Sequence, residues 1–342
     1  MNPIAVYFDT TVLYWSSILI SVGLLAALFM SLSLQVTNGG RIVSMMLFFP
    51  LAILFSVPLC RILHWYCHQE QYGGFFKAVT DYTAGSYVLP AAIPGVWLAA
   101  WIAAKLDDGD TAKLLDAAAP GAALTVAFVR LSALFSSACR SKIPVTAEFL
   151  QHLPLAAGIT NSAGATEYRF ATFFAHFLLM MLLCVFLLKY FLKRRFMPMR
   201  AGRREGNTIN MFLLYYSASE LVLDSTRYDS SFLPINGFVS IVQIITSVCI
   251  LLLLIHYSRL SIRANGRRFW HWLMWLVWLI VLLGVGATEY LVQRHGDWYL
   301  GCYGAMGFCC IVLAFIVYRL YLSCCGSIVE DESGGDSSEE EQ

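Results

Sequence analysis

The chain has 342 residues, of which 58% are hydrophobic and only 13% are charged. Soluble domains carry about 25% charged residues, so this composition excludes a water-facing globular surface and indicates a membrane protein. The net charge of +1, with no basic patch interleaved with aromatic residues, argues against a nucleic-acid partner. The spacing of Cys and His residues is not typical of a metal site, and we expect neither a metal nor a cofactor.

Apolar runs recur along the chain, each near the length of about 20 residues that crosses a bilayer. The first is expected to be a membrane helix rather than a signal peptide, because it is too long and no basic segment precedes it. The sixth is the least apolar, since it holds Glu220 and Asp224, which must face a cavity or a partner. The sequence thus predicts an all-α, polytopic membrane helix bundle with about nine transmembrane helices, near residues 13–34, 42–62, 87–105, 117–138, 171–192, 208–225, 237–258, 269–292 and 299–323.

Lysine and arginine residues gather on one side of the predicted bundle. The fifth connection, KYFLKRRFMPMRAGRR, carries seven, and the seventh carries Arg259, Arg263, Arg267 and Arg268. Apart from Arg130, which lies within a predicted helix, fifteen of the lysine and arginine residues fall on this side and seven on the other. Because cytoplasmic loops retain positive charge, an odd number of crossings predicts an external N-terminus and a cytoplasmic C-terminus.

Two segments outside the predicted helices are long enough to matter. The external segment Cys139–Tyr168 holds four proline and glycine residues, so a single long helix is not expected there. It is either a lid over the membrane domain or a plain loop. After Cys325 the sequence GSIVEDESGGDSSEEEQ is acidic and almost without apolar residues, which predicts a disordered tail.

Ionisable side chains inside the predicted helices mark the candidate site, because each is costly in a bilayer without a partner, a water-filled cavity or a ligand. Arg130 lies near the middle of its predicted helix, and Glu220, Asp224 and Arg227 share one helix face. In one interpretation, the planar guanidinium of Arg130 binds the phosphate of a lipid head group. In the other, Arg130 pairs with Glu220 or Asp224 to hold two helices together, and Asp224 pairs with Arg227.

Two further ionisable residues are interpreted as structural. His176 lies early in the fifth predicted helix and is expected to be a buried imidazole whose hydrogen bonds are satisfied. Arg61 lies at the outer end of the second predicted helix and is expected to anchor that end in the membrane interface.

Five segments carry a resemblance to a known family. In order and spacing they are similar to the motifs of prolipoprotein diacylglyceryl transferases, bacterial inner-membrane enzymes that move a diacylglyceryl group from phosphatidylglycerol to the lipobox cysteine of a secreted precursor. The segments are LCRILHWYC, GSYVLPAAIPG, LLDAAAPGAALTVAFVRLSALF, GNTINMFLLYYSASELVLDSTRYD and GFVSIVQIITS. The resemblance implies a transferase-like seven-helix domain over residues 1–258, followed by two additional transmembrane helices over 259–325 and the acidic tail over 326–342.

Individual positions match the family unevenly. Arg130 matches its essential arginine, Tyr216 its tyrosine, and Arg227 and Gln243 a later arginine and glutamine, while Asp224 replaces a glutamate. The departures are at positions where the family has histidine, asparagine, glutamate and a second phosphate-facing arginine, and which here hold Pro90, Ala133, Ala138 and Glu220.

The resemblance implies a reaction in which the precursor's cysteine thiolate attacks the glycerol carbon and glycerol phosphate leaves. Its catalytic candidates here are Arg130, Tyr216, Glu220 and Asp224, with Arg130 and Arg227 as ligands of the lipid phosphate. The general base is left open between His176, Glu220 and Asp224. The implied partners are phosphatidylglycerol, lipoprotein precursor signal peptides and membrane lipid, in a bacterial inner membrane. The alternative is a non-catalytic paralogue that binds phospholipid or lipoprotein precursors.

Overall fold

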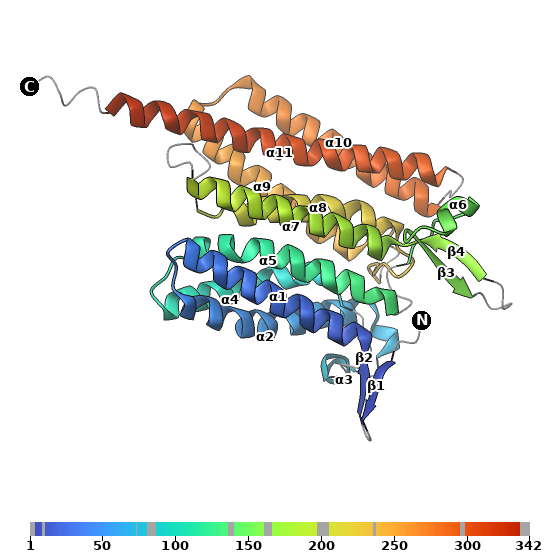
Figure 1. The fold of residues 1–342 in the computed structure, drawn as a ribbon. Helices are drawn as coiled ribbons and strands as arrows, with labels where there is room; N and C mark the ends of the chain where they lie inside the picture. Colours follow the sequence, from blue (N-terminus) through green and yellow to red (C-terminus); the bar gives the residue numbers. More distant parts are fainter. Residues whose placement is uncertain are drawn as a thin grey trace, which may run out of the picture.

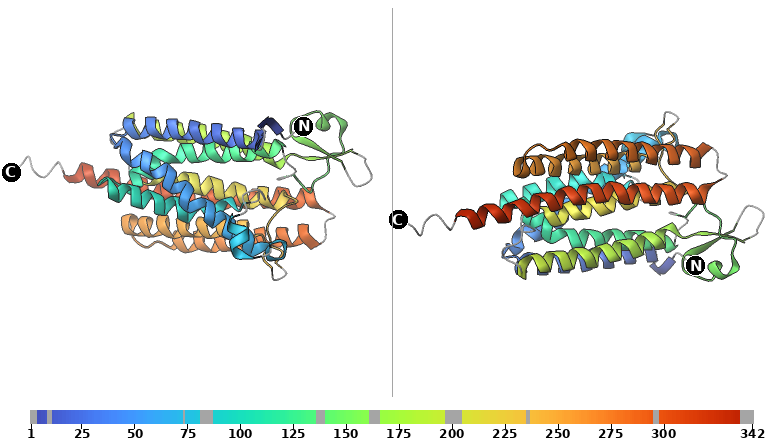
Figure 2. Two further views of the ribbon diagram at one scale, coloured as in Figure 1. Left: turned by 90° about the horizontal axis from the view of Figure 1, so that it is seen from below. Right: turned by 90° about the horizontal axis from the view of Figure 1, so that it is seen from above.

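The fold is a bundle of long helices that alternate in direction along the chain (Figures 1 and 2). It is seen in a computed structural model that describes residues 4–8, 11–72, 74–80, 87–135, 140–160, 166–196, 205–234, 237–294 and 298–335. Within these residues the long helices are α1 (Trp15–Thr37), α2 (Ile42–Cys67), α4 (Ala92–Leu106), α5 (Thr111–Ser132), α7 (Thr172–Phe196), α8 (Asn207–Thr226), α9 (Ile241–Asn265), α10 (Phe269–Arg294) and α11 (Tyr299–Gly335).

Eight of these helices are long and apolar enough to cross a membrane, which confirms a polytopic membrane bundle. The exception is α8, the sixth helix of the sequence prediction, so the structure supports one apolar crossing fewer than the nine expected. The cause is the polar content of α8, whose side chains Glu220 and Asp224 are fully buried. Its neighbours are α5, α7, α9 and α11, and these helices supply the partners that a polar membrane helix requires.

Helices α1, α2, α4 and α5 form one half of the bundle, and small residues bring them close together. A Cβ atom at Gly121 of α5 would lie 2.3 Å from the Oγ of Ser31 on α1. A Cβ atom at Gly95 of α4 would lie 2.9 Å from the backbone nitrogen of Ser56 on α2. Glycine is therefore needed at both crossings, as is common where membrane helices pack by van der Waals contact.

The other half contains α7 to α11, and α5 packs against both halves. One apolar core runs through α5, α7, α8, α9, α10 and α11, so the two last helices share it rather than lying beside it. The expected boundary between residues 258 and 259 falls inside α9 (Ile241–Asn265). The additional helices are thus joined to the preceding ones by a continuous helix and a continuous core.

Two β-hairpins lie at one end of the bundle, called the hairpin end below (Figure 1). Strands β1 (Ile4–Phe8) and β2 (Thr11–Tyr14) form the first, and β3 (Ala156–Thr160) and β4 (Thr166–Phe170) form the second. The short helices α3 (Phe75–Thr80) and α6 (Glu148–Gln151) lie at the same end. The two hairpins are the exceptions to the expected all-α fold.

The described parts of the segment left open as a lid or a loop, residues 140–160 and 166–168, are folded and pack on the end of α8. The backbone nitrogen of Lys142 donates to the carbonyl oxygen of Thr226 at 2.8 Å, and that of Tyr228 donates to Arg140 at 2.8 Å. At the opposite end of the bundle, α11 continues to Gly335, past the start of the acidic tail at residue 326. Residues 336–342 of the tail lie outside the described residues, where its disorder stays an expectation.

Candidate functional site

A buried ion pair joins α5 to α8 near the hairpin end. Nη2 of Arg130, in the last turn of α5, donates to Oε1 of Glu220 on α8 at 2.7 Å. The side chains of Arg130 and Glu220 are 6% and 0% exposed. His176 of α7 places Nε2 3.6 Å from the same Glu220 oxygen. Three helices thus bring one cation, one carboxylate and one imidazole together away from solvent.

Tyr216 lies one turn before Glu220 on α8 and belongs to the same cluster. Its ring stacks on Phe212, with centroids 5.5 Å apart and planes 8° apart, and the side chain is 3% exposed. The phenol interacts electrostatically with both Glu220 and Arg130. Tyr216 is therefore placed to donate a hydrogen bond to a carboxylate, or to a ligand oxygen that takes the carboxylate's place.

A second ion pair lies where α8 ends. Arg227 is the C-cap residue of α8, and its Nη1 lies 3.3 Å from Oδ1 of Asp224, one turn earlier. The other face of the guanidinium meets Asp229, with Nε and Nη2 each 3.1 Å from a carboxylate oxygen. The second Asp224 oxygen accepts a hydrogen bond from the hydroxyl of Ser240, the N-cap residue of α9. This contact fixes the end of α8 against the start of α9.

Glu289 of α10 is a buried carboxylate that the sequence analysis missed. It is 1% exposed, and its Oε2 accepts hydrogen bonds from the hydroxyl of Ser225 and, at 3.0 Å, from Nε2 of Gln243. Its Oε1 accepts from Nε2 of Gln293 at 2.7 Å. A lone carboxylate in the apolar run LIVLLGVGATEYLV was the signal that could have found it.

Through Glu289, the added helices reach the polar end of α8. Lys142, in the segment that covers this end, donates from Nζ to Oε1 of Gln293 at 3.2 Å. Burial lowers the pKa of Lys142, and the carboxylates of Glu289 and Asp224 partly oppose that shift. The network therefore extends from Lys142 across α10 to the polar end of α8.

The structure contains both pairs of the structural interpretation, Arg130 with Glu220 and Asp224 with Arg227. It also connects the catalytic and phosphate-binding candidates from the sequence, because α8 carries three of them and each arginine pairs with one of the α8 carboxylates. These candidates are Arg130, Tyr216, Glu220, Asp224 and Arg227. Arg130 is paired with Glu220, and Arg227 with Asp224 and Asp229. Oε1 of Glu220 therefore occupies the Nη2 position of the Arg130 guanidinium.

Two structural interpretations need correction. Nε2 of His176 has no hydrogen-bond partner among the described residues, so this nitrogen is not satisfied by its neighbours and faces Glu220 instead. Arg61 does not reach an interface, because it is 1% exposed. Its Nε donates to the carbonyl oxygen of Ala78 at 2.7 Å, and its guanidinium lies over the rings of Tyr72 and Tyr87 at 5.3 and 5.5 Å.

Apart from Glu220, the positions that depart from the family motifs carry apolar side chains. Pro90 is buried in the short helix Leu89–Ala91, which packs against α2 and α9. Ala133 is buried just beyond the end of α5, and Ala138 lies outside the described residues. Within the described part of the chain, no group of three or more His, Cys, Asp or Glu side chains is arranged to hold a metal ion.

These contacts define what the cluster can do chemically. Glu220 and His176 are close enough to share a proton after a small movement, and Oε2 of Glu220 has no hydrogen-bond partner among the described residues. The guanidinium of Arg130 offers a planar fork to any anion that displaces Glu220. The site therefore holds an acid–base pair and a cation in contact through a single carboxylate.

Together, the fold and the buried charges define a multi-pass membrane protein with an ionisable site sealed inside its helix bundle. The family model of prolipoprotein diacylglyceryl transferase matches residues 3–258. The chain therefore belongs to this transferase family, as its motifs indicate. No match was found among curated proteins. The matched region ends inside α9, so α10 and α11 lie beyond it.

Proposed function

We propose that the chain transfers a diacylglyceryl group from phosphatidylglycerol to the lipobox cysteine of lipoprotein precursors in a bacterial inner membrane. The observation that carries this proposal is the cluster around Glu220. It joins Arg130, Tyr216 and His176 at the hairpin end of a bundle whose sequence belongs to the transferase family. A buried cation beside a carboxylate and an imidazole meets the two needs of the reaction, charge stabilisation and proton removal.

The proposed mechanism begins with an exchange of partners at Arg130. The lipid phosphate displaces Glu220 from the guanidinium, so that the carboxylate becomes available as a base, with His176 beside it. Glu220 then takes the proton of the precursor's thiol, and the resulting thiolate attacks the glycerol carbon. A carbon–sulfur bond forms, the carbon–oxygen bond to phosphate breaks, and glycerol phosphate leaves with its negative charge stabilised by Arg130 and Tyr216.

Asp224 and Arg227 have a different place in this proposal. Arg227 is 12% exposed at the side chain, which makes it the more accessible of the two arginines and a second ligand for phosphate. Asp224 holds Arg227 and, through Ser240, the start of α9. Asp224 therefore positions Arg227 and is the weaker candidate for the base, because one of its oxygens faces a cation and the other accepts a hydrogen bond.

A second function has its own supporting observation. Arg130 is already neutralised by Glu220 at 2.7 Å, and the residue at the family's histidine position is Pro90, which has no acid–base group. Both features suit a non-catalytic paralogue that holds phospholipid or lipoprotein precursors without transferring the diacylglyceryl group. The two functions make opposite predictions for lipidation.

The test is complementation in a bacterium whose own transferase can be depleted, with the mobility shift of a lipoprotein precursor as the readout. We expect the wild-type chain to restore the shift and R130A to abolish it. The matched control is R294A, because Arg294 is an exposed arginine at the same end of the bundle; it should lipidate normally. Membrane-inserted wild-type protein that never shifts the precursor would overturn the transferase proposal and support the non-catalytic one.

A further inference from the structure

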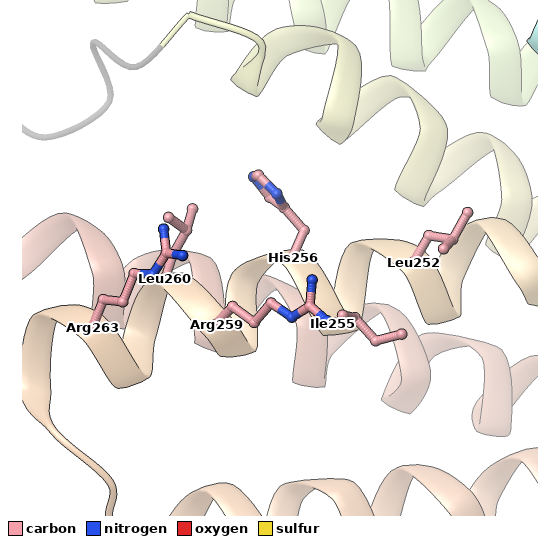
Figure 3. Close-up of a pocket in the computed structure, with 6 residues that line it drawn as sticks. All are labelled: Leu252, Ile255, His256, Arg259, Leu260 and Arg263. Carbon is pink, nitrogen blue, oxygen red and sulfur yellow. The ribbon is translucent and has the colours of Figure 1, made fainter.

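A cavity of about 330 Å³ lies along α9 towards the end opposite the hairpins. Figure 3 shows that the side chains that line it all come from this one helix. They are spaced three, four and seven residues apart, which places them on one helix face. The lining residues are Leu252, Ile255, His256, Arg259, Leu260 and Arg263.

The charges in this cavity are of one sign. Arg259 and Arg263 are both exposed and are four residues apart, a spacing at which like charges repel. Among the ion pairs of the described residues, none includes Arg259 or Arg263. His256, one turn earlier, adds a third group that carries positive charge when protonated. An anion between the two arginines would remove the repulsion and supply their counter-charge.

The apolar part of the cavity indicates what kind of molecule carries that anion. Leu252 is 60% exposed and lies about 16 Å before Arg263 along the helix axis, from the rise of about 1.5 Å per residue. Helix α9 is one of the helices long and apolar enough to cross a membrane. The arginines occupy its last turns, where the head groups of a bilayer lie, and Leu252 and Ile255 lie deeper. An amphiphile with an anionic head fits this order, whereas a small anion would leave the apolar half unused.

We propose that this face of α9 binds an anionic phospholipid, with Arg259 and Arg263 on its phosphodiester and an acyl chain along Leu252 and Ile255. The site is separate from the Arg130 cluster. Gln243, which belongs to the network at the hairpin end, is 16 residues from Arg259, or about 24 Å along the helix. The proposal does not depend on transferase activity, because it concerns a lipid that stays bound rather than one that reacts.

The test uses the full chain in nanodiscs with a phosphatidylglycerol that carries a photoactivatable group in its acyl chain, followed by peptide mapping. We expect labelling of α9 between residues 252 and 263. The variant R259Q/R263Q should weaken this labelling about thirtyfold, because each basic residue near a membrane surface strengthens binding of an anionic lipid by roughly fivefold. R259K/R263K, which keeps both charges, should retain most of it.

The matched control is R319Q, because Arg319 is an exposed arginine of the neighbouring helix α11, one turn before Ser323, which contacts Ser261 and Asn265 of α9. In R319Q the lipid probe should label α9 to the same extent as in the wild type. Unlabelled phosphatidylglycerol and phosphatidic acid should compete, whereas phosphatidylcholine and inorganic phosphate should not. Equal labelling in R259Q/R263Q, or equal competition by phosphatidylcholine, would show ordinary boundary lipid and overturn the proposal. Competition by inorganic phosphate would show that the site binds a free anion rather than a lipid, and would overturn the proposal as well.

Discussion

At the scale of single residues, the site depends on how Arg130 and Glu220 compensate one another. Both side chains are removed from solvent, and burial of either charge alone costs far more than burial of the pair. The pair also joins α5 to α8 across 90 positions of sequence. A structural role and a phosphate-binding role are therefore both compatible with the same contact, and substitutions that separate charge from packing are needed to distinguish them.

Removing one member of the pair should be strongly destabilising. E220L leaves the guanidinium of Arg130 buried without a counter-charge, and we expect the free energy of unfolding in detergent to fall by about 3–5 kcal/mol. The matched control is E167Q, since Glu167 pairs with Arg169 at 3.3 Å with its side chain 51% exposed. That surface pair should be worth about 1 kcal/mol or less. Equal losses in the two variants would contradict the role given to the buried pair.

Replacing both members should separate stability from function. In R130M/E220L two apolar side chains of similar length take the place of the ions, and such replacements of buried pairs are often neutral or stabilising. We expect the free energy of unfolding to return to within about 1.5 kcal/mol of the wild-type value, the usual limit for apolar substitutions that conserve volume. Precursor lipidation should nevertheless remain absent. Lipidation by this folded double variant would show that Arg130 has only a structural role.

At the scale of elements, α10 is part of the polar network rather than an appendage. Its Glu289 accepts hydrogen bonds from Ser225 near the end of α8 and Gln243 near the start of α9. Tyr303 of α11 also donates to the carbonyl oxygen of Ser225, at 3.2 Å. Two helices beyond the family match thus hold the segment that carries Asp224 and Arg227.

Loss of the Glu289 carboxylate should loosen the hairpin ends of α8 and α9. We expect E289A to raise amide hydrogen exchange in residues 222–226 and 240–244, because Ser225 and Gln243 lose their acceptor. Exchange at the opposite end of α9 should not change. The double variant E289Q/Q243E swaps the carboxylate and the amide and so keeps one carboxylate between the same helices. It should recover most of the protection of these amides from hydrogen exchange.

The control for this experiment is L283A, on the same helix, because Leu283 is 65% exposed and faces away from the core. It should leave exchange at both segments unchanged. An increase of the same size in L283A and E289A would indicate a general weakening of α10 rather than the loss of a specific acceptor. Because the readout is exchange, the result does not depend on whether the chain catalyses lipidation.

At the scale of the whole molecule, the helices alternate in direction, and the described chain begins with β1 at the hairpin end and finishes with α11 at the opposite end of the bundle (Figure 1). The hairpin end carries residues 140–160 and 166–168, and the opposite end carries Arg259 and Arg263. This arrangement agrees with an odd number of passages through the bundle. The charge asymmetry of the loops then assigns the hairpin end to the outside, as a prediction of the positive-inside rule.

Reporter fusions test this orientation. Alkaline phosphatase, which is active only outside the cytoplasm, should be active when fused after Arg294 and inactive after Gly266 or after Gln342. A fluorescent protein at the C-terminus should fold and emit in the cytoplasm. An active phosphatase at the C-terminus would reverse the assignment of both ends.

The sequence by itself determined the class of protein and most helix positions. The ranges 42–62 and 208–225 correspond to Ile42–Cys67 and Asn207–Thr226, because runs of apolar residues and their polar ends are local properties. The sequence also selected Arg130, Glu220 and Asp224, since the cost of a charge in a bilayer does not depend on the details of the fold.

Only the tertiary structure decided which groups meet. The β-hairpins escaped prediction because strand pairing depends on partners that short segments do not specify alone. Helix packing brings Glu289 of α10 to Ser225 and Gln243. It also places Nε2 of His176 on α7 3.6 Å from Glu220 on α8. Arg61 is buried, with its guanidinium over the rings of Tyr72 and Tyr87, rather than exposed at an interface. The physical reason is common to these cases: the partner of a buried polar group is set by helix packing, which hydropathy and spacing along one chain do not encode.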